Sequence, residues 1–283
     1  MEKTRNFNVL DGFVLKILAI VFMTFDHVGV FLETYGNLQE IASIFRLLGR
    51  FSFPLIIFLL VEGIMHTKNI RLYFLRLSLL AFVFMIGQLG FYIFDKGSAI
   101  HFYSPAIDLL LTAATVYLLK REDKLSYLVI LPFAWSIACL IVRYFELANT
   151  VNIKWIPFVL RPDYLILGPV LGAAFYYAHD LTRLFFNARE DTKNFLDTTY
   201  EQITSNVISS ILLIILILLI TFVDSLTIKV ISDIPWEVYS LFAFIPILFY
   251  SGKRGYDAKW FKYGCYIYFP AHLILIYLIF SLL

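Results

Sequence analysis

Long apolar stretches constrain the fold of this chain more than any other feature of its sequence. A membrane-spanning helix needs roughly 20 apolar residues, and nine stretches of about that length follow one another along the chain. They lie at 11–35, 43–67, 72–95, 104–120, 125–146, 163–181, 204–224, 236–252 and 259–281. The eighth is short and the fourth is borderline, so totals of eight or ten stay open. We therefore predict an all-α fold, a polytopic bundle of about nine transmembrane helices.

The composition excludes an ordinary soluble domain. Hydrophobic residues make up 60% of the 283 residues and the mean hydropathy is +0.80, whereas soluble domains are about 45–50% apolar. The net charge of +2 leaves no strongly basic face for nucleic acid. Cys139 and Cys265 lie in apolar stretches without metal-binding spacing, so packing is their expected role. These features predict a multi-pass protein of the cell membrane, surrounded by the lipid bilayer.

The basic residues predict the orientation of the chain in the membrane. With a cytoplasmic N-terminus, the inward-facing segments hold about twice as many Lys and Arg residues as the outward-facing ones, in accord with the positive-inside rule. The first stretch carries charges and lacks a small-residue cleavage site, so we expect a retained helix rather than a signal peptide. One membrane domain fills 1–283. In it we expect an amphipathic cytoplasmic connector at 182–205 and an external headgroup segment with Trp155 at 147–163.

The first span contains ionisable residues that lipid alone does not explain. Lys16 and His27 are eleven positions apart, which places them on one helical face about 16 Å apart along the axis. Asp26 points about 100° away from His27 and should therefore meet another helix. Lys16 alone is equally explained by snorkelling to the inner surface, and Asp26 by a structural pair with an arginine. His27 has no such explanation and is a functional candidate.

Other ionisable residues lie in or beside the later spans, where such groups usually face a cavity or a partner. Arg46 and Arg50 share one face at the outer end of the second span. They would bind a phosphate, a carboxylate or Asp26, or else lipid headgroups. The remaining candidates are Glu62 with His66 one turn later, Asp108, Asp163 beside Tyr164, and His272, for which a hydrogen-bonded core histidine is the alternative. No metal-ligand motif is present, and no metal is expected.

Three segments resemble a known family. They are "LKILAIVFMTFDHVG", "FRLLGRFSFPLIIFLLVEGIMHTKNIRLYFLRLSLLAF" and, near the C-terminus, "KYGCYIYFPAHLILIYLI". They resemble the TraX family of membrane acyltransferases, similar to the larger superfamily that modifies cell-surface sugars. That superfamily has a basic residue, ten residues and a histidine on its first helix, matched here by Lys16 and His27. The fourth span departs from the family, because Asp108 stands where an Asn-containing stretch is usual.

The resemblance implies transfer of an acetyl or other short acyl group from cytoplasmic acetyl-coenzyme A. The family's namesake is implied to acetylate the amino terminus of F-type pilin. The resemblance leaves the acceptor of this chain open between a pilin or peptide amine and a glycan or glycolipid hydroxyl, at the outer side. His27 would be the general base, Asp26 or Asp163 would orient it, and Arg46 or Arg50 would stabilise the oxyanion. The expected donor- and substrate-binding residues are Lys16, Glu62, Asp108, Asp163, Tyr164 and His272.

Two other functions fit the same residues. A proton-coupled transporter also needs intramembrane Lys, Asp, His and Glu, although no inverted repeat is visible in the sequence. A membrane assembly factor that catalyses no reaction would not need these ionisable residues for its activity. Consumption of acyl-coenzyme A would separate an acyltransferase from both.

Overall fold

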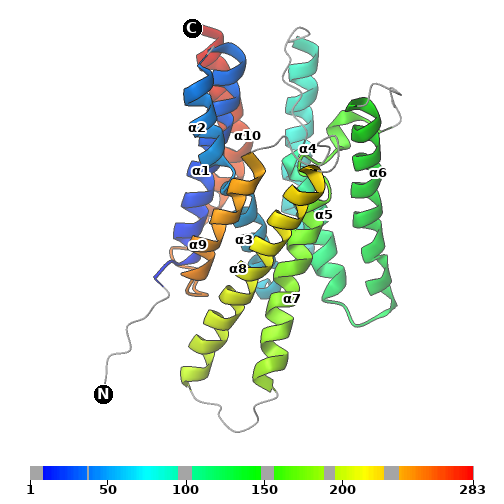
Figure 1. Cartoon of the computed structure of the whole chain (residues 1–283), viewed down its shortest axis with the longest axis vertical. Helices are drawn as coiled ribbons and strands as arrows, with labels where there is room; N and C mark the ends of the chain where they lie inside the picture. The colour runs from blue at the N-terminus through cyan, green and yellow to red at the C-terminus, as the bar shows by residue number, and fades with distance from the viewer. Residues whose placement is uncertain are drawn as a thin grey trace.

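A computed structural model describes residues 9–36, 38–94, 104–147, 156–187, 195–225 and 236–282. Those residues form helices that run mostly along one common axis (Figure 1). Six helices in the described ranges are long and apolar enough to cross a membrane: Gly12–Tyr35, Gln39–His66, Ile70–Gly90, Lys124–Glu146, Tyr200–Val223 and Lys259–Phe280. The predicted all-α, multi-pass membrane bundle is confirmed.

The predicted number of nine full spans needs correction. Two of the nine stretches form shorter apolar helices, Pro105–Leu119 and Glu237–Leu248. A third, α7 (Leu167–Asn187), is long enough but carries His179, Asp180 and Arg183 toward its end, so its composition is less apolar. The start of α1 (Gly12–Tyr35) and the end of α10 (Lys259–Leu282) nevertheless lie at opposite ends of the bundle, as an odd number of passes requires (Figure 1).

The first helix is fixed at its start by its own cap and by a distant loop. The side chain of Asp11 accepts a hydrogen bond from the backbone N–H of Val14 at 2.9 Å, a normal N-cap. The backbone N–H of Gly12 donates to the carbonyl of Lys253 at 2.7 Å. Gly255 adopts φ +67° beside Asp11, where an added Cβ would overlap the carboxylate. The end of α1 that carries Lys16 is therefore held against the loop before α10.

The second predicted span is a broken helix. It consists of α2 (Gln39–Gly49) and α3 (Ser52–His66), separated by Arg50 and Phe51. A Cβ at Gly49 would overlap the backbone and Cβ of Asp26, so only glycine permits this approach of α2 to α1. The break thus lies directly beside the Asp26–His27 pair.

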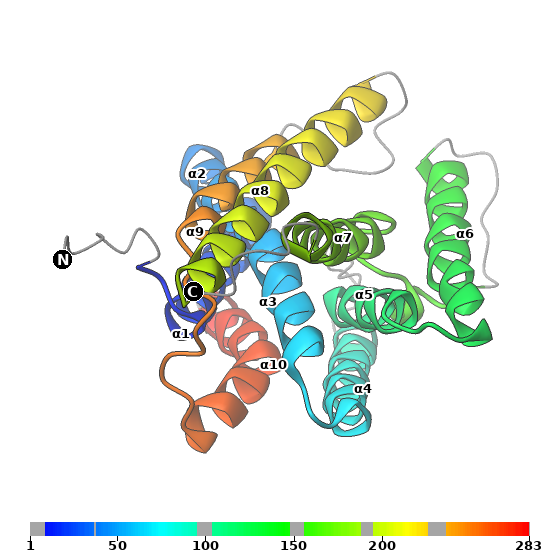
Figure 2. The ribbon, with the colours of Figure 1, turned by 90° about the horizontal axis from the view of Figure 1, so that it is seen from below.

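The remaining helices pack around α3 or against the helices next to it. They are α4 (Ile70–Phe94), α5 (Pro105–Leu119), η1 (Lys124–Val129) with α6 (Ile130–Leu147), α7, α8 (Phe195–Ser225), η3 (Trp236–Ala243) with α9 (Phe244–Leu248), and α10. Leu55, Ile57, Phe58 and Val61 on α3 are at most 1% exposed and form the centre of the main core. Seen along the bundle, α3 lies between α1 and α10 on one side and α5 and α7 on the other, with α6 at the periphery (Figure 2).

The two predicted connectors differ from expectation in their described parts. Residues 182–187 continue α7, and 195–205 begin α8, so these parts of 182–205 extend the neighbouring helices instead of forming a separate one. Trp155 and the rest of 148–155 fall outside the described residues, while η2 (Phe158–Leu160) forms a short 3-10 turn.

Candidate functional site

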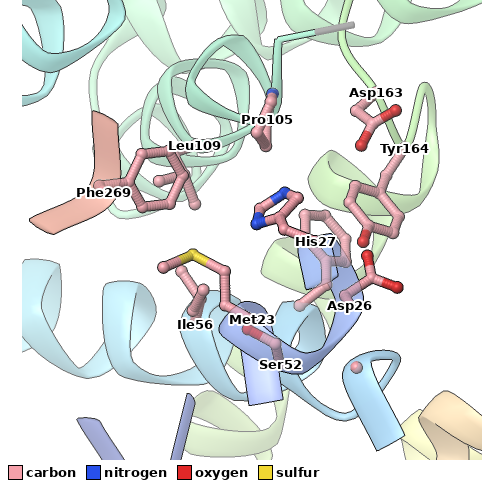
Figure 3. Close-up of a pocket in the computed structure, with 12 residues that line it drawn as sticks. Met23, Asp26, His27, Ser52, Ile56, Pro105, Leu109, Asp163, Tyr164 and Phe269 are labelled. Carbon is pink, nitrogen blue, oxygen red and sulfur yellow. The ribbon is translucent and has the colours of Figure 1, made fainter. Parts of the chain in front are cut away.

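A small cavity of about 40 Å³ lies beside the polar residues of α1. His27 lies in its middle, between an acidic side with Asp26, Asp163 and Tyr164 and an apolar side (Figure 3). The break between α2 and α3 contributes Gly49 and Ser52. The full lining is Met23, Asp26, His27, Gly49, Ser52, Phe53, Ile56, Pro105, Leu109, Asp163, Tyr164 and Phe269. Four segments distant in sequence therefore converge on His27.

His27 is held by a second histidine. Its Nδ1 lies 2.7 Å from Nε2 of His272 on α10, and Nδ1 of His272 lies 2.8 Å from the backbone carbonyl of Tyr268. A carbonyl only accepts, so Nδ1 of neutral His272 carries the proton and its Nε2 accepts from Nδ1–H of His27. Neutral His27 then has its lone pair on Nε2. The backbone of α10 thereby sets the tautomer that a general base requires.

The pairing of α1 with α10 is reinforced one turn away. The hydroxyl of Thr24 donates to the carbonyl of Ile20 at 2.8 Å and lies 2.7 Å from the hydroxyl of Tyr268. The ring of Tyr268 is stacked on His272 with an interplanar angle of 7°. His272 is only 3% exposed. His272 therefore has the contacts of a hydrogen-bonded core histidine. It also orients the ring of His27, a role that was expected of Asp26 or Asp163.

Asp26 faces arginines rather than His27. Its carboxylate lies 3.2 Å from Arg50 and 3.6 Å from Arg46, both at the end of α2, and Arg50 also contacts Glu237 at 2.5 Å. The four groups form a network of two positive and two negative charges, in which Arg50 and Glu237 are buried and Asp26 and Arg46 are partly buried. In the described residues, Arg46 and Arg50 do not line the small cavity, so their position supports a structural pairing with Asp26 more than an oxyanion role.

Glu237 is a member of this network that the sequence analysis missed. It lies at the start of the short eighth stretch, in "IPWEVYSLF", and is 8% exposed. A single carboxylate in an otherwise apolar stretch was an available signal, because such a residue requires a partner.

Asp108 positions the segment that forms the acidic side of the cavity. It is fully buried on α5, and its Oδ2 accepts the backbone N–H groups of Asp163 at 2.6 Å and Tyr164 at 3.2 Å. The ring of Tyr164 is stacked on Phe53 with centroids 3.6 Å apart. Asp108 therefore acts through the backbone, and only Asp163 and Tyr164 of this group line the cavity.

A much larger cavity, of about 680 Å³, opens toward the predicted cytoplasmic end of the bundle. Its walls contain five basic residues and one acidic residue, Asp257, which contacts one of them at 3.4 Å. The basic residues are Lys16, Lys68, Arg76, Arg254 and Lys262. Deeper in, the lining is apolar, with Leu72, Leu77 and Leu80 of α4. Lys16 and His27 thus line successive parts of one cavity system along one face of α1.

The two cavities share part of their walls. Met23, Ile56, Leu109 and Phe269 line both. They come from α1, α3, α5 and α10, and Figure 3 shows them together on one side of His27, opposite Asp163 and Tyr164. These four residues, which we call the junction residues, separate the basic cavity from the acidic one.

Glu62 belongs to a different polar cluster. Its carboxylate lies 2.6 Å from Nε2 of His179 on α7, and the other ring nitrogen of His179 lies 3.2 Å from the hydroxyl of Ser205 on α8. Tyr250 and His66 contact the second carboxylate oxygen at 3.4 and 3.7 Å. Glu62 lines neither the small nor the large cavity, and its assignment to donor binding stays a prediction.

Within the described ranges, no group of three His, Cys, Asp or Glu side chains could hold a metal ion. Cys139 is buried on α6, whereas Cys265 on α10 lines the large cavity. The cavity system is built from charged, aromatic and aliphatic side chains.

Comparison with known proteins places the chain in a family context. The model of the TraX protein family matches residues 11–188, which include Lys16, His27 and Asp163. The chain is also 31% identical over 144 residues to the probable fimbrial assembly protein FimC, serogroup H1, of Dichelobacter nodosus. That alignment covers 48% of this chain and 57% of the relative, so the chain spans little more than half of the relative's length. No solved structure matches.

Proposed function

This chain belongs to the TraX protein family, and we propose that it is a membrane acyltransferase that moves an acetyl group from acetyl-coenzyme A to an amine or hydroxyl acceptor. The family is associated with acetylation of F-pilin. One observation carries the proposal: the oriented base His27 lies at the junction between a basic cavity and an acidic cavity. Such a junction suits a reaction in which donor and acceptor arrive from opposite sides.

The larger cavity fits the donor in charge and in size. Coenzyme A carries its phosphates at one end and a long, thin pantetheine arm at the other. The basic residues at the cavity mouth would bind the phosphates, and the apolar wall of α4 would accommodate the arm. A volume of about 680 Å³ lies within the roughly 300–1,000 Å³ typical of small-molecule sites. The thioester would then end beside the junction residues.

His27 would act on the acceptor from the other side of the junction. Its Nε2 takes the proton from the acceptor N–H or O–H while that nitrogen or oxygen attacks the thioester carbon. The new C–N or C–O bond forms, the C–S bond breaks, and the sulfur leaves with the bonding electrons. The proton on His27 then passes to this thiolate, which yields free coenzyme A and neutral His27. His272 keeps the ring in the required tautomer throughout.

The acidic side of the small cavity would hold the acceptor. Asp163 and Tyr164 line it and are positioned by Asp108, and the hydroxyl of Tyr164 supplies a hydrogen-bond donor for the acceptor or for the oxyanion. The Asp26 network fixes α1 against α2 and η3. We assign it a positioning role, because its charges are directed at one another.

Cys265 allows a direct test of donor binding. It lines the large cavity, whereas Cys139 is 1% exposed and serves as an internal control. Purified protein in nanodiscs would be treated with a maleimide and the modified cysteines identified by mass spectrometry. We expect acetyl-coenzyme A to protect Cys265, and Lys262→Ala combined with Arg254→Ala to weaken that protection. Unchanged labelling at saturating acetyl-coenzyme A would overturn the assignment of the cavity.

Turnover distinguishes the enzyme from its alternatives. The same preparation would be supplied with radiolabelled acetyl-coenzyme A and a short peptide with a free amino terminus. An acyltransferase consumes the donor, whereas a proton-coupled transporter or an assembly factor does not. Protection of Cys265 without any consumption would favour a binding protein over an enzyme.

A further inference from the structure

We propose that the four junction residues Met23, Ile56, Leu109 and Phe269 form a gate that favours transfer of acetyl over longer acyl groups. The inference rests on the proposed acyltransferase function and adds the residues that select the donor. It follows from the position of these side chains, which line both cavities and therefore lie where the end of the donor must pass.

The gate is built on the same helices as the histidine pair. Met23 precedes His27 by one turn on α1, and Phe269 precedes His272 by three residues on α10, so each lies on the face of its histidine. Leu109 directly follows Asp108 on α5. An acyl group that reaches His27 from the large cavity therefore passes side chains that are held by the same helices as His27, His272 and Asp108.

The gate residues have little freedom to move aside. Met23 and Leu109 are each 6% exposed, and the ring of Phe269 packs against Phe84 of α4 in a tilted arrangement, with centroids 5.7 Å apart. Ile56 is packed against the main core. A well-packed interior resists insertion of additional methylene groups because neighbouring side chains must leave their preferred rotamers.

The size of the inner cavity sets the limit on the acyl group. The small cavity, of about 40 Å³, is far smaller than the large cavity, of about 680 Å³. A short acyl group such as acetyl therefore fits beside His27 more easily than a longer one, whose added methylene groups would press on the gate.

The test compares kcat/KM for acetyl-, propionyl-, butyryl- and octanoyl-coenzyme A with one acceptor. A hydrophobic pocket discriminates about 10- to 200-fold per methylene, so we expect wild type to prefer acetyl to butyryl by at least about tenfold. Met23→Ala should reduce this ratio by about tenfold or more. Met23→Leu, which nearly conserves volume, and Leu80→Ala, which enlarges only the large cavity, should leave the ratio unchanged.

Size-exclusion chromatography and thermal unfolding would show whether Met23→Ala folds. If it does not, a second variant tests the gate. Leu109→Val removes a single methylene from the gate and should shift the ratio in the same direction, toward propionyl. Equal use of acetyl and butyryl by wild type, or a ratio unaffected by both gate variants, would overturn the gate and leave the acyltransferase intact. Failure to consume any of the four donors would instead refute the proposed function, and the gate with it.

Discussion

Two histidine clusters lie within the described part of this bundle, and they differ in their position relative to the small and large cavities. His27 contacts His272 at 2.7 Å and faces the junction of two cavities. His179 contacts Glu62 at 2.6 Å and Ser205 at 3.2 Å. Neither Glu62 nor Ser205 lines the small or the large cavity. The second cluster connects α3, α7 and α8, as a structural crosslink does. Ionisable groups inside a membrane bundle thus mark a site only where substrate can reach them.

The largest effect expected from this comparison is on turnover. His27→Ala removes the general base and should lower acetyl transfer by about 10²–10⁴-fold, whereas His179→Ala should change the rate per folded molecule by less than about twofold because it lies outside the reaction path. Radiolabelled acetyl transfer by both purified variants measures this difference. If both variants lost acetyl transfer to a similar extent, the assignment of a catalytic role to the His27 cluster and a structural role to the His179 cluster would be wrong.

The next effect concerns stability. Arg50 is 8% exposed and lies between Asp26 and Glu237. Arg50→Ala therefore leaves both carboxylates without the positive charge of this guanidinium. Breaking such a network by removing one partner costs about 3–5 kcal/mol. Unfolding of the purified protein in mixed detergent measures the loss. The double variant Arg50→Ala, Glu237→Gln should recover part of it, and no recovery would contradict the pairing.

A smaller effect tests the role of His272 as a positioning residue. His272→Ala leaves the Nδ1–H of His27 without its acceptor, a loss of about 1–3 kcal/mol, which lowers kcat roughly 5- to 150-fold. His272→Gln supplies an amide oxygen and should restore most of the rate. The acid limb of the pH–rate profile should also move in His272→Ala, since it reports protonation of the base. A lower yield of folded protein with an unchanged profile would indicate a purely structural role.

The smallest effect lies outside both clusters, at the end of α5. The hydrogen bond from Arg121 holds the pKa of the exposed Asp123 below its ordinary value. A lowered folded pKa contributes stability above the unfolded pKa of about 3.9, and this contribution is lost as the pH falls through the folded pKa. Asp123→Asn should therefore slightly reduce thermal stability at pH 7, and the difference from wild type should shrink as the pH falls through the folded pKa. Acetyl transfer by this variant should match wild type.

The sequence predicted the helices well because apolar length is a local property. Each of the nine predicted stretches contains helix in its described part, and the start of the first, at 11–35, agrees with α1 to within one residue. The break at Arg50 and Phe51 was not visible, since it depends on how closely Gly49 packs against Asp26. The extension of α7 and α8 into 182–205 was missed because polar residues in that region indicated an interfacial connector.

The sequence singled out individual residues of the candidate site but not the contacts between them. Helical periodicity placed Lys16 and His27 on one face, and both line the cavity system. The contact between His27 and His272 joins residues 245 positions apart, which no local pattern in one sequence can reveal. Glu62 was assigned to the donor site because a buried charge looks the same in sequence whether it faces a cavity or another helix.

The most direct test of the central claim is a structure of the protein with an uncleavable donor analogue. In a ketone analogue of acetyl-coenzyme A, a methylene group separates sulfur from the carbonyl, so the bond cannot be broken by transfer. Our account predicts nucleotide density beside Lys68, Arg254 and Lys262, and the carbonyl beside His27 beyond the junction residues. Density for the nucleotide at the acidic end, or an acyl group that stays in the large cavity away from His27, would contradict the account.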